Sequence, residues 1–225
     1  MIVKIKRRRT PDSESYWQSF LYDGPEHVTV SAVLDALNYT DDLFDTEGNP
    51  AARIRWECSC VQAVCGGCAM VINGVPALAC NTFVDEVAKK SELVLEPLSK
   101  FPVVADLVVD RGIIYENLNH AKAYIESISA GSSKEHEHQY SVAKCLKCGL
   151  CLEVCPNYFS GEKFFGAVFA NESYLIASQS AEKPAQLVKE YKTHFGAGCS
   201  KALSCQNVCP VGIETITSIM KMNRK

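Results

Sequence analysis

The sequence contains no long hydrophobic run. Nowhere in its 225 residues does an apolar stretch approach the ~20 residues that a helix needs to span a bilayer. Its beginning also shows no apolar segment of the kind found in secretory signal peptides. We therefore expect a cytoplasmic protein that is either soluble or held at the inner face of the cell membrane through a partner subunit.

An excess of positive charge is also missing. The formal net charge is -3, which argues against a nucleic-acid partner. The one basic run, residues 4–9, alternates with apolar residues at its start, as in a half-exposed strand. We find no nucleophile, acid–base or phosphate-loop motif, so a substrate site in this chain is not expected.

Cysteine, by contrast, is abundant. Twelve cysteines among 225 residues are too many for idle thiols, and in a reducing compartment dense cysteine patterns indicate metal or redox sites rather than disulfides. The rest of the composition, 47% apolar and 22% charged, is that of an ordinary globular protein. Length and composition therefore allow two small domains built around these sites.

Residues 1 to about 100 have the pattern of a small mixed sheet crossed by one helix. Apolar alternation predicts the strands, and the dipeptide Asn73-Gly74 between two of them is a strong hairpin signal. The helix is expected behind Thr29 as its N-cap. The expected strands cover residues 1–6, 16–22, 69–72, 75–80 and 92–96, and the expected helix covers residues 30–37.

From Asp106 onward the pattern favours helices. They are expected over residues 117–128, around 145–155, over 185–195 and over 214–222. The polar stretch 131–139 is interpreted as a solvated loop, and its His136 and His138 are assigned no metal-binding role.

The first cysteine group has the spacing of a plant-type [2Fe–2S] loop. It reads C-x4-C-x2-C, and a fourth cysteine follows beyond the predicted hairpin, which would bring it back beside the loop. Thiolates are soft ligands that suit iron, and Gly66 and Gly67 would let the backbone approach a cluster closely. The predicted ligands are Cys60, Cys65, Cys68 and Cys80.

Two alternatives stay open for this group. Four cysteines can also hold Zn²⁺, although structural zinc usually uses paired short C-x2–4-C knuckles. Cys58 is the twelfth, surplus cysteine and could be an alternative ligand. We favour a free thiol for it, because Cys60 already completes the expected spacing.

The other seven cysteines form two ferredoxin-type runs. C-x2-C-x2-C-x3-C-P begins at Cys145, and the fourth cysteine of such a run serves the other cluster. C-x5-C-x3-C-P begins at Cys199 and matches a second run in which Ala202 replaces the middle cysteine. Exchange of the fourth cysteines leaves three thiolates for one cluster, which suits a [3Fe–4S] centre. The predicted ligands are Cys145, Cys148, Cys151 and Cys209 for a [4Fe–4S] cluster, and Cys155, Cys199 and Cys205 for the [3Fe–4S] cluster.

Together these motifs resemble the iron-sulfur subunit of succinate dehydrogenase and fumarate reductase. The resemblance covers nearly the whole chain and includes, besides the cysteine groups, the stretches 68–70 (CAM), 78–80 (LAC) and 106–110 (DLVVD). The predicted fold is accordingly α+β. A β-grasp, plant-type ferredoxin-like domain is expected over residues 1–104, and an all-α, bacterial-ferredoxin-like (helical ferredoxin) domain over residues 105–225.

The resemblance implies partners as well. In this family a flavoprotein subunit with FAD interconverts succinate and fumarate, and a membrane anchor carries a quinone and in some cases haem. The iron-sulfur subunit would pass single electrons between flavin and quinone. Its [2Fe–2S] cluster would face the flavin, its [4Fe–4S] cluster would be intermediate, and its [3Fe–4S] cluster would lie nearest the quinone. No residue of this chain would bind succinate.

Two positions depart from the succinate dehydrogenase pattern. Family members commonly have a Trp shortly after the first C-P and a His directly after the first cysteine of the last run. This chain has residues 157–160 (NYFS) and Ser200 there, which favours the fumarate-reducing members. The expected neighbours of a quinone or anchor contact are Pro156, Ser160 and Lys201.

Two other functions stay open on the sequence. An iron-sulfur partner of another flavoenzyme, such as a glycolate oxidase or a heterodisulfide reductase-like system, would usually show two full runs, and Ala202 counts against it. A zinc scaffold that binds partners without redox work would be colourless, whereas thiolate-bound iron is coloured.

Overall fold

The computed structural model describes residues 1–88, 92–125, 127, 136–181 and 184–224. The chain divides into two compact units, Met1–Asp110 and Arg111–Lys225. The domain boundary after residue 104 stays a prediction. Among the residues described, none of the helices combines the length and the apolar character that crossing a membrane requires.

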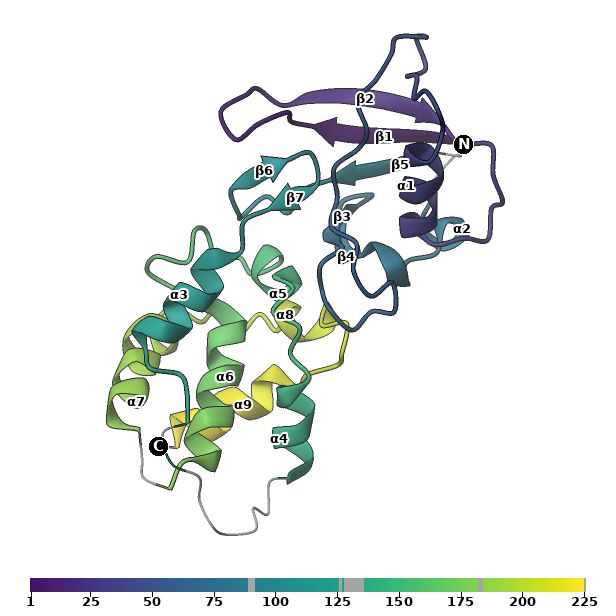
Figure 1. Ribbon diagram of the computed structural model, residues 1–225. Helices are drawn as coiled ribbons and strands as arrows, with labels where there is room; N and C mark the ends of the chain where they lie inside the picture. Colours follow the sequence, from purple (N-terminus) through teal and green to yellow (C-terminus); the bar gives the residue numbers. More distant parts are fainter. Residues whose placement is uncertain (89–91, 126, 128–135, 182–183, 225) are drawn as a thin grey trace. The chain divides into compact units, whose positions relative to one another are not determined.

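The first unit is built on a mixed sheet with the strand order β2-β1-β5-β3-β4 (Figure 1). The central strands β1 and β5 run parallel, and the other pairs are antiparallel. This β-grasp arrangement confirms the predicted fold. The strands are β1 (Ile2–Arg7), β2 (Tyr16–Leu21), β3 (Ala69–Ile72), β4 (Val75–Leu78) and β5 (Glu92–Glu96).

One helix, α1 (Val30–Asn38), packs on the sheet and closes the core of this unit. Thr29 caps it as predicted, because its side-chain oxygen accepts a hydrogen bond from the backbone N–H of Ala32 at 3.3 Å. Val33 and Leu34 of the helix are fully buried, as are Val3 and Ile5 of β1. The alternation of apolar residues in β1 therefore marks its inner face.

The hairpin between β3 and β4 turns at the predicted dipeptide. Asn73 and Gly74 both have left-handed backbone angles, with φ of 47° and 79°, as a two-residue type I′ turn requires. The Asn73 side chain also donates to the Val87 carbonyl and accepts from the Val94 N–H, each at 2.7 Å. After β4 the chain forms a 3₁₀ turn, Ala79–Asn81, and the short helix α2 (Val84–Val87).

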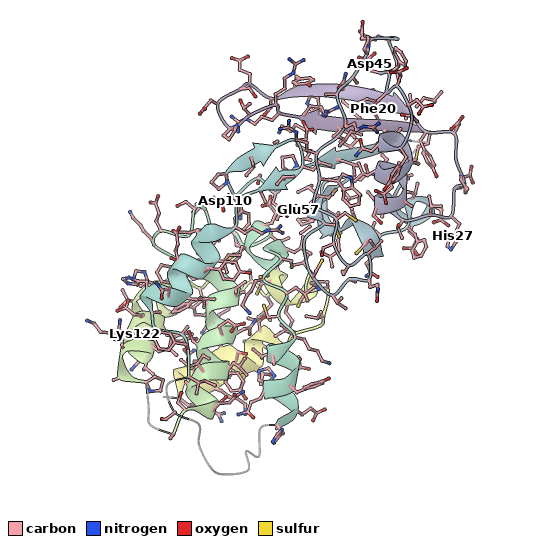
Figure 2. The ribbon with its side chains drawn as sticks, in the orientation of Figure 1. Phe20, His27, Asp45, Glu57, Asp110 and Lys122 are labelled. Atoms are coloured by element: carbon pink, nitrogen blue, oxygen red, sulfur yellow. The ribbon has the colours of Figure 1, made fainter. Side chains whose placement is uncertain are left out.

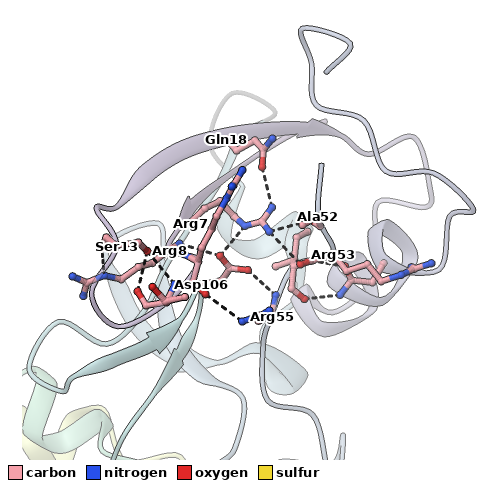
Figure 3. Close-up of polar contacts among 12 residues, drawn as sticks. Arg7, Arg8, Ser13, Gln18, Ala52, Arg53, Arg55 and Asp106 are labelled. Carbon is pink, nitrogen blue, oxygen red and sulfur yellow. Dashed lines mark hydrogen bonds and ion pairs between the residues drawn. The ribbon is translucent and has the colours of Figure 1, made fainter. Parts of the chain in front are cut away.

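Asp106 is the centre of a buried polar network in the first unit (Figure 3). It lies in the turn between β6 (Val103–Ala105) and β7 (Val108–Val109). Its carboxylate lies 3.0 Å from Nε of Arg7 and accepts the backbone N–H groups of Arg8 and Arg55, each at 2.9 Å. Arg7 and Asp106 are only 2% and 3% exposed, so this ion pair is screened little by solvent.

The second unit is helical, as predicted. Its α-helices are α3 (Gly112–His120), α4 (His136–Ala143), α5 (Leu150–Glu153), α6 (Gly166–Gln179), α7 (Ala185–Tyr191), α8 (Ser204–Asn207) and α9 (Thr215–Asn223). A π-helical turn, Lys192–Gly196, continues α7. The core gathers around α6, against which α9, α7, α4 and α5 all pack.

Three expectations for this unit were wrong in part. The helix expected over residues 117–128 is α3, which starts at Gly112 and ends before Lys122, whose φ of 51° is left-handed; Lys122 is labelled in Figure 2. The segment around 145–155 is helical only over α5. Of the stretch expected as a solvated loop, residues 131–135 lie outside the described residues, while His136 begins α4.

Tertiary contacts explain the correction at α4. The ring of His138 lies 4.7 Å from that of Tyr174 on α6, and its Nε2 lies 3.0 Å from the hydroxyl oxygen of Ser218 on α9. A segment whose sequence is polar is thus held as a helix by packing on the core.

Replacement of Asp106 by Asn tests the buried network. The amide keeps the shape of the side chain but leaves the Arg7 guanidinium buried without its counter-charge, so we expect the first unit to lose about 3–5 kcal/mol of stability. Hydrogen exchange of the β1 backbone amides measures this loss locally. Asp12→Asn, at an exposed aspartate of the same unit, is the control, and equal exchange in both variants would contradict a stabilising role for the ion pair.

Candidate iron-sulfur cluster sites

The first cysteine group converges in space. Cys60, Cys65 and Cys68 lie on the loop that leads into β3, and Cys80 lies in the 3₁₀ turn that follows β4. The hairpin folds this turn back, so that Sγ of Cys68 and Sγ of Cys80 are 3.3 Å apart. The hairpin at Asn73-Gly74 thus brings Cys80 back beside the loop, as predicted.

Backbone N–H groups point at the thiols of this loop. Cys60 Sγ accepts from the N–H groups of Gln62 and Val64 at 3.3 and 3.4 Å, and Cys80 Sγ accepts from Ala63 at 3.3 Å. The loop reaches this shape through left-handed backbone at Val61 and Ala63. Such N–H···S contacts favour thiolate sulfur and are the kind of interaction that tunes a bound cluster.

The two glycines of the loop differ in what they contribute. Gly66 has a φ of 75°, so its backbone conformation itself requires glycine. A Cβ at Gly67 would lie 3.6 Å from Sγ of Cys65, which is an ordinary van der Waals contact. Glycine at position 66 is therefore required by its backbone conformation, while the room that either glycine would give a bound cluster stays a prediction.

The thiols of the loop ionise differently. Hydrogen bonds from the N–H groups of Gln62 and Val64 lower the pKa of Cys60 to about 7, whereas burial raises the pKa of Cys68 to about 12. Cys58 is exposed, and desolvation, the Asp35 carboxylate and the neighbouring thiolates raise its pKa. Cys58 thus lies near the group but is a poorer thiolate than Cys60.

In the second unit the cysteines gather at two cavities. The first cavity is lined by three cysteines of the run that begins at Cys145 and by two of the later run: Cys145, Cys148, Cys151, Cys205 and Cys209. The second is lined by Cys155, Cys199 and Cys205, together with Ala202. Each cavity therefore receives cysteines from both runs, and Cys205 lines both.

The two runs have the same local backbone. Left-handed residues stand two and four positions after the first cysteine in each run: Lys147 and Gly149 after Cys145, and Lys201 and Leu203 after Cys199. A one-turn helix follows in each case, α5 and α8 respectively. This correspondence places Ala202 at the position that Cys148 holds in the first run.

Burial makes the thiols of these cavities weaker acids than an ordinary cysteine. It raises the pKa of Cys145 and of Cys205 to about 11, and it raises the pKa values of Cys148 and Cys151 as well. Neighbouring thiolates add to the effect at Cys151 and Cys205. Thiolates collected here therefore need a cation to offset burial and their mutual repulsion, which suits bound iron.

A half-buried cation, the Lys147 ammonium, lies at the first cavity. Nζ of Lys147 is 2.9 Å from Oε1 of Glu172 on α6. Burial by itself would lower the pKa of Lys147, but the Glu172 carboxylate outweighs it and the pKa is raised. Lys147 thus stays charged beside Cys145.

The residues expected near a quinone lie in different places. Pro156 and Lys201 line the second cavity, whereas Ser160 is exposed and is not one of its lining residues. The two positions that depart from the family pattern meet at 2.8 Å, where the Ser200 hydroxyl donates to Oδ1 of Asn157. Contact of any of these residues with a quinone stays a prediction.

Comparison with known families assigns a cluster type to each part of the chain. Residues 2–116 match a 2Fe-2S iron-sulfur cluster binding domain. Residues 140–213 match a 4Fe-4S dicluster domain, and residues 111–160 match a second family of the same description. These matches confirm the predicted order of a 2Fe-2S sheet domain followed by a helical two-cluster domain.

Relatives match this chain over nearly its whole length. The chain is 31% identical to the succinate dehydrogenase iron-sulfur subunit of Bacillus subtilis, over 98% of this chain and 90% of that protein. It is 30% identical to a fumarate reductase iron-sulfur subunit of Escherichia coli, over 95% of this chain and 88% of that protein. A chain of the Mycobacterium smegmatis Sdh1 complex shares the fold, with a TM-score of 0.75 and 22% identity over 100% of this chain and 96% of that one.

The raised thiol pKa values predict that the second unit binds iron more tightly as the pH rises. Its buried thiols are protonated near neutral pH in the metal-free chain and must lose protons to become ligands, so binding strengthens up to the raised pKa values. The measurement is the iron that the protein retains in the presence of a chelator at roughly pH 7 and pH 9. The chelator is chosen so that its own affinity for iron is the same at both pH values. Retention that is unchanged or lower at the higher pH would contradict thiolate ligation in these cavities.

Proposed function

The chain belongs to the family of iron-sulfur subunits of succinate dehydrogenase and fumarate reductase, and from that premise we propose which partners and clusters it serves. It is an electron-transfer subunit of such a complex and carries a 2Fe-2S domain and a 4Fe-4S dicluster domain. We propose that it relays electrons between the FAD of a flavoprotein subunit, where succinate and fumarate are interconverted, and a quinone at a membrane anchor. That anchor would hold it at the inner face of the membrane.

The observation that carries this proposal is the convergence of eleven thiols at three places. We propose Cys60, Cys65, Cys68 and Cys80 as ligands of a [2Fe–2S] cluster, Cys145, Cys148, Cys151 and Cys209 as ligands of a [4Fe–4S] cluster, and Cys155, Cys199 and Cys205 as ligands of a [3Fe–4S] cluster. The first set is supported by the 3.3 Å approach of Cys68 and Cys80. The other two are supported by the cavity linings.

Cys205 lines both cavities, so the cluster that it binds has to be assigned. The first cavity already has four other cysteines, which complete a cubane. The second has only Cys155 and Cys199 without it. Cys205 is therefore proposed as a ligand of the second cluster, where Ala202 leaves one corner without a thiolate.

When bound, such clusters accept and donate single electrons. The chain itself holds them and sets their environment. N–H groups of Gln62, Ala63 and Val64 donate to the thiols of the first loop and would stabilise negative charge there. The charged Lys147 would do the same at the first cavity of the second unit. The cysteines of both cavities are buried or half-buried, which limits the contact of their thiols with water.

Electron paramagnetic resonance of the anaerobically purified complex tests the cluster content. We expect a [3Fe–4S] signal in the oxidised sample, a [2Fe–2S] signal after reduction, and about nine irons per chain with no zinc at the cysteines. About ten irons and no oxidised three-iron signal would mean that another ligand fills the corner at Ala202. Zinc bound by the cysteines in place of iron would overturn the electron-transfer role.

Replacement of Cys205 by Ser tests the ligand sets. We expect loss of the [3Fe–4S] signal with the [2Fe–2S] signal retained, because the ligands of the two centres lie in different units. Cys58→Ser is the matched control and should retain every signal, since Cys58 is surplus. Loss of both signals in a folded Cys205→Ser variant, or loss of the [2Fe–2S] signal in Cys58→Ser, would contradict the proposed sets.

Replacement of Ala202 by Cys adds a ligand instead of removing one, and it tests the corner of the second cluster that has no thiolate. Ala202 occupies the position equivalent to Cys148, so the new thiol should hold a fourth iron and convert the oxidised three-iron signal into a four-iron centre. Iron counted per chain should rise by about one. An unchanged three-iron signal would show that residue 202 does not face that corner.

A further inference from the structure

A second group of metal-ligating side chains lies apart from the cysteines, at the surface of the helical unit. It consists of His120, the last residue of α3, and of Glu190 and His194, which stand one turn apart on α7 and the π-helical turn after it. One ligand atom from each residue lies within 4.8 Å of the others.

The distances within this group match those of a metal site. Oε2 of Glu190 lies 3.5 Å from Nε2 of His120 and 3.3 Å from Nε2 of His194. Two atoms that each bind a tetrahedral zinc ion at about 2.0–2.1 Å are about 3.3–3.4 Å apart. Charge-assisted hydrogen bonds between imidazolium and carboxylate are shorter, about 2.7–2.9 Å.

The tautomer of His194 strengthens the argument. Its Nδ1 lies 2.9 Å from the carbonyl oxygen of Lys163, and a carbonyl oxygen only accepts, so Nδ1 carries a hydrogen. In the neutral ring Nε2 then presents its lone pair toward the Glu190 carboxylate. Two acceptors at 3.3 Å need a cation between them, either a proton or a metal ion. A metal ion would satisfy both histidines and the carboxylate at once.

The surroundings hold the ligands in place. The His194 ring stacks on Phe165, with centroids 4.1 Å apart and planes at 5°. The Gln186 side chain on α7 donates to the His120 carbonyl at 3.2 Å and fastens the end of α3. A histidine ligand whose second ring nitrogen donates to a backbone carbonyl is the usual arrangement at metal sites, and π-helical turns are frequent at functional sites.

We propose that His120, Glu190 and His194 bind one divalent transition-metal ion, with Zn²⁺ as the best match to two imidazoles and one carboxylate. The His120 side chain is 61% exposed, so water completes the coordination. Because its ligands come from α3 and α7, the ion clamps the start of the helical unit to a helix far along the sequence. This site is independent of the clusters and of the electron-transfer role.

The test uses the cluster-loaded complex, so that the cysteines are occupied. Wild type and variants receive one equivalent of Zn²⁺ anaerobically and are desalted, and zinc and iron are then counted. X-ray absorption at the zinc edge identifies the ligands, because Zn–N and Zn–O bonds are about 2.0–2.2 Å and Zn–S bonds about 2.3 Å. The variants are His120→Gln and Glu190→Gln, with His136→Gln at an exposed histidine of α4 as the control.

We expect about one zinc per chain with nitrogen and oxygen ligands only, in wild type and in the control, and binding weaker by tenfold or more in both site variants. Iron content and cluster signals should be the same in all four samples, which shows that the fold is intact. Zinc bound through sulfur, zinc retained equally by the site variants, or no zinc retained by wild type would overturn the proposal. In the last case Glu190 pairs with protonated histidines instead.

Discussion

The two cysteine-lined cavities depend on the burial of α6. Ten of its fourteen residues are buried, and they form a wall of both cavities: Val168 and Asn171 face the first, and Ala167 faces the second. The Asn171 amide donates to the Thr215 hydroxyl at the start of α9, and Glu172 holds Lys147. The packing of this one helix therefore brings together two cysteine runs that are far apart in the sequence.

The cysteine-bearing loops around α6 must turn sharply. Cysteines separated by two residues can face one centre only if the chain turns sharply between them. Both runs make such turns with left-handed residues at equivalent positions. Only Gly149 is a glycine, while Lys147, Lys201 and Leu203 adopt a backbone conformation that L residues seldom take. Such strain is usual at functional sites, and here the surrounding helices hold it.

Electrostatics links folding to metal binding. The same burial that encloses the thiols of the second unit raises their pKa values, so the metal-free cavities disfavour the thiolates that iron requires. Iron offsets both the burial and the repulsion among thiolates, and its binding free energy then contributes to folding. In the first unit, backbone N–H groups already lower the pKa of Cys60, so part of that loop is prepared for a ligand before iron arrives.

Sequence by itself determined the features that depend on local spacing. The Thr29 cap, the Asn73-Gly74 turn, the five strands of the main sheet and the cysteine motifs could all be predicted, because capping, turn geometry and ligand spacing act over a few residues. The short strands β6 and β7 were not predicted. Only the tertiary structure decided the rest. The helix α6 was not predicted, because a helix buried nearly all round has no polar face and shows no helical periodicity. The group of His120, Glu190 and His194 was missed for a related reason. Glu190 and His194 are one helical turn apart, but His120 lies far earlier in the sequence, and only the packing of α3 beside α7 brings its ligand atom to the other two.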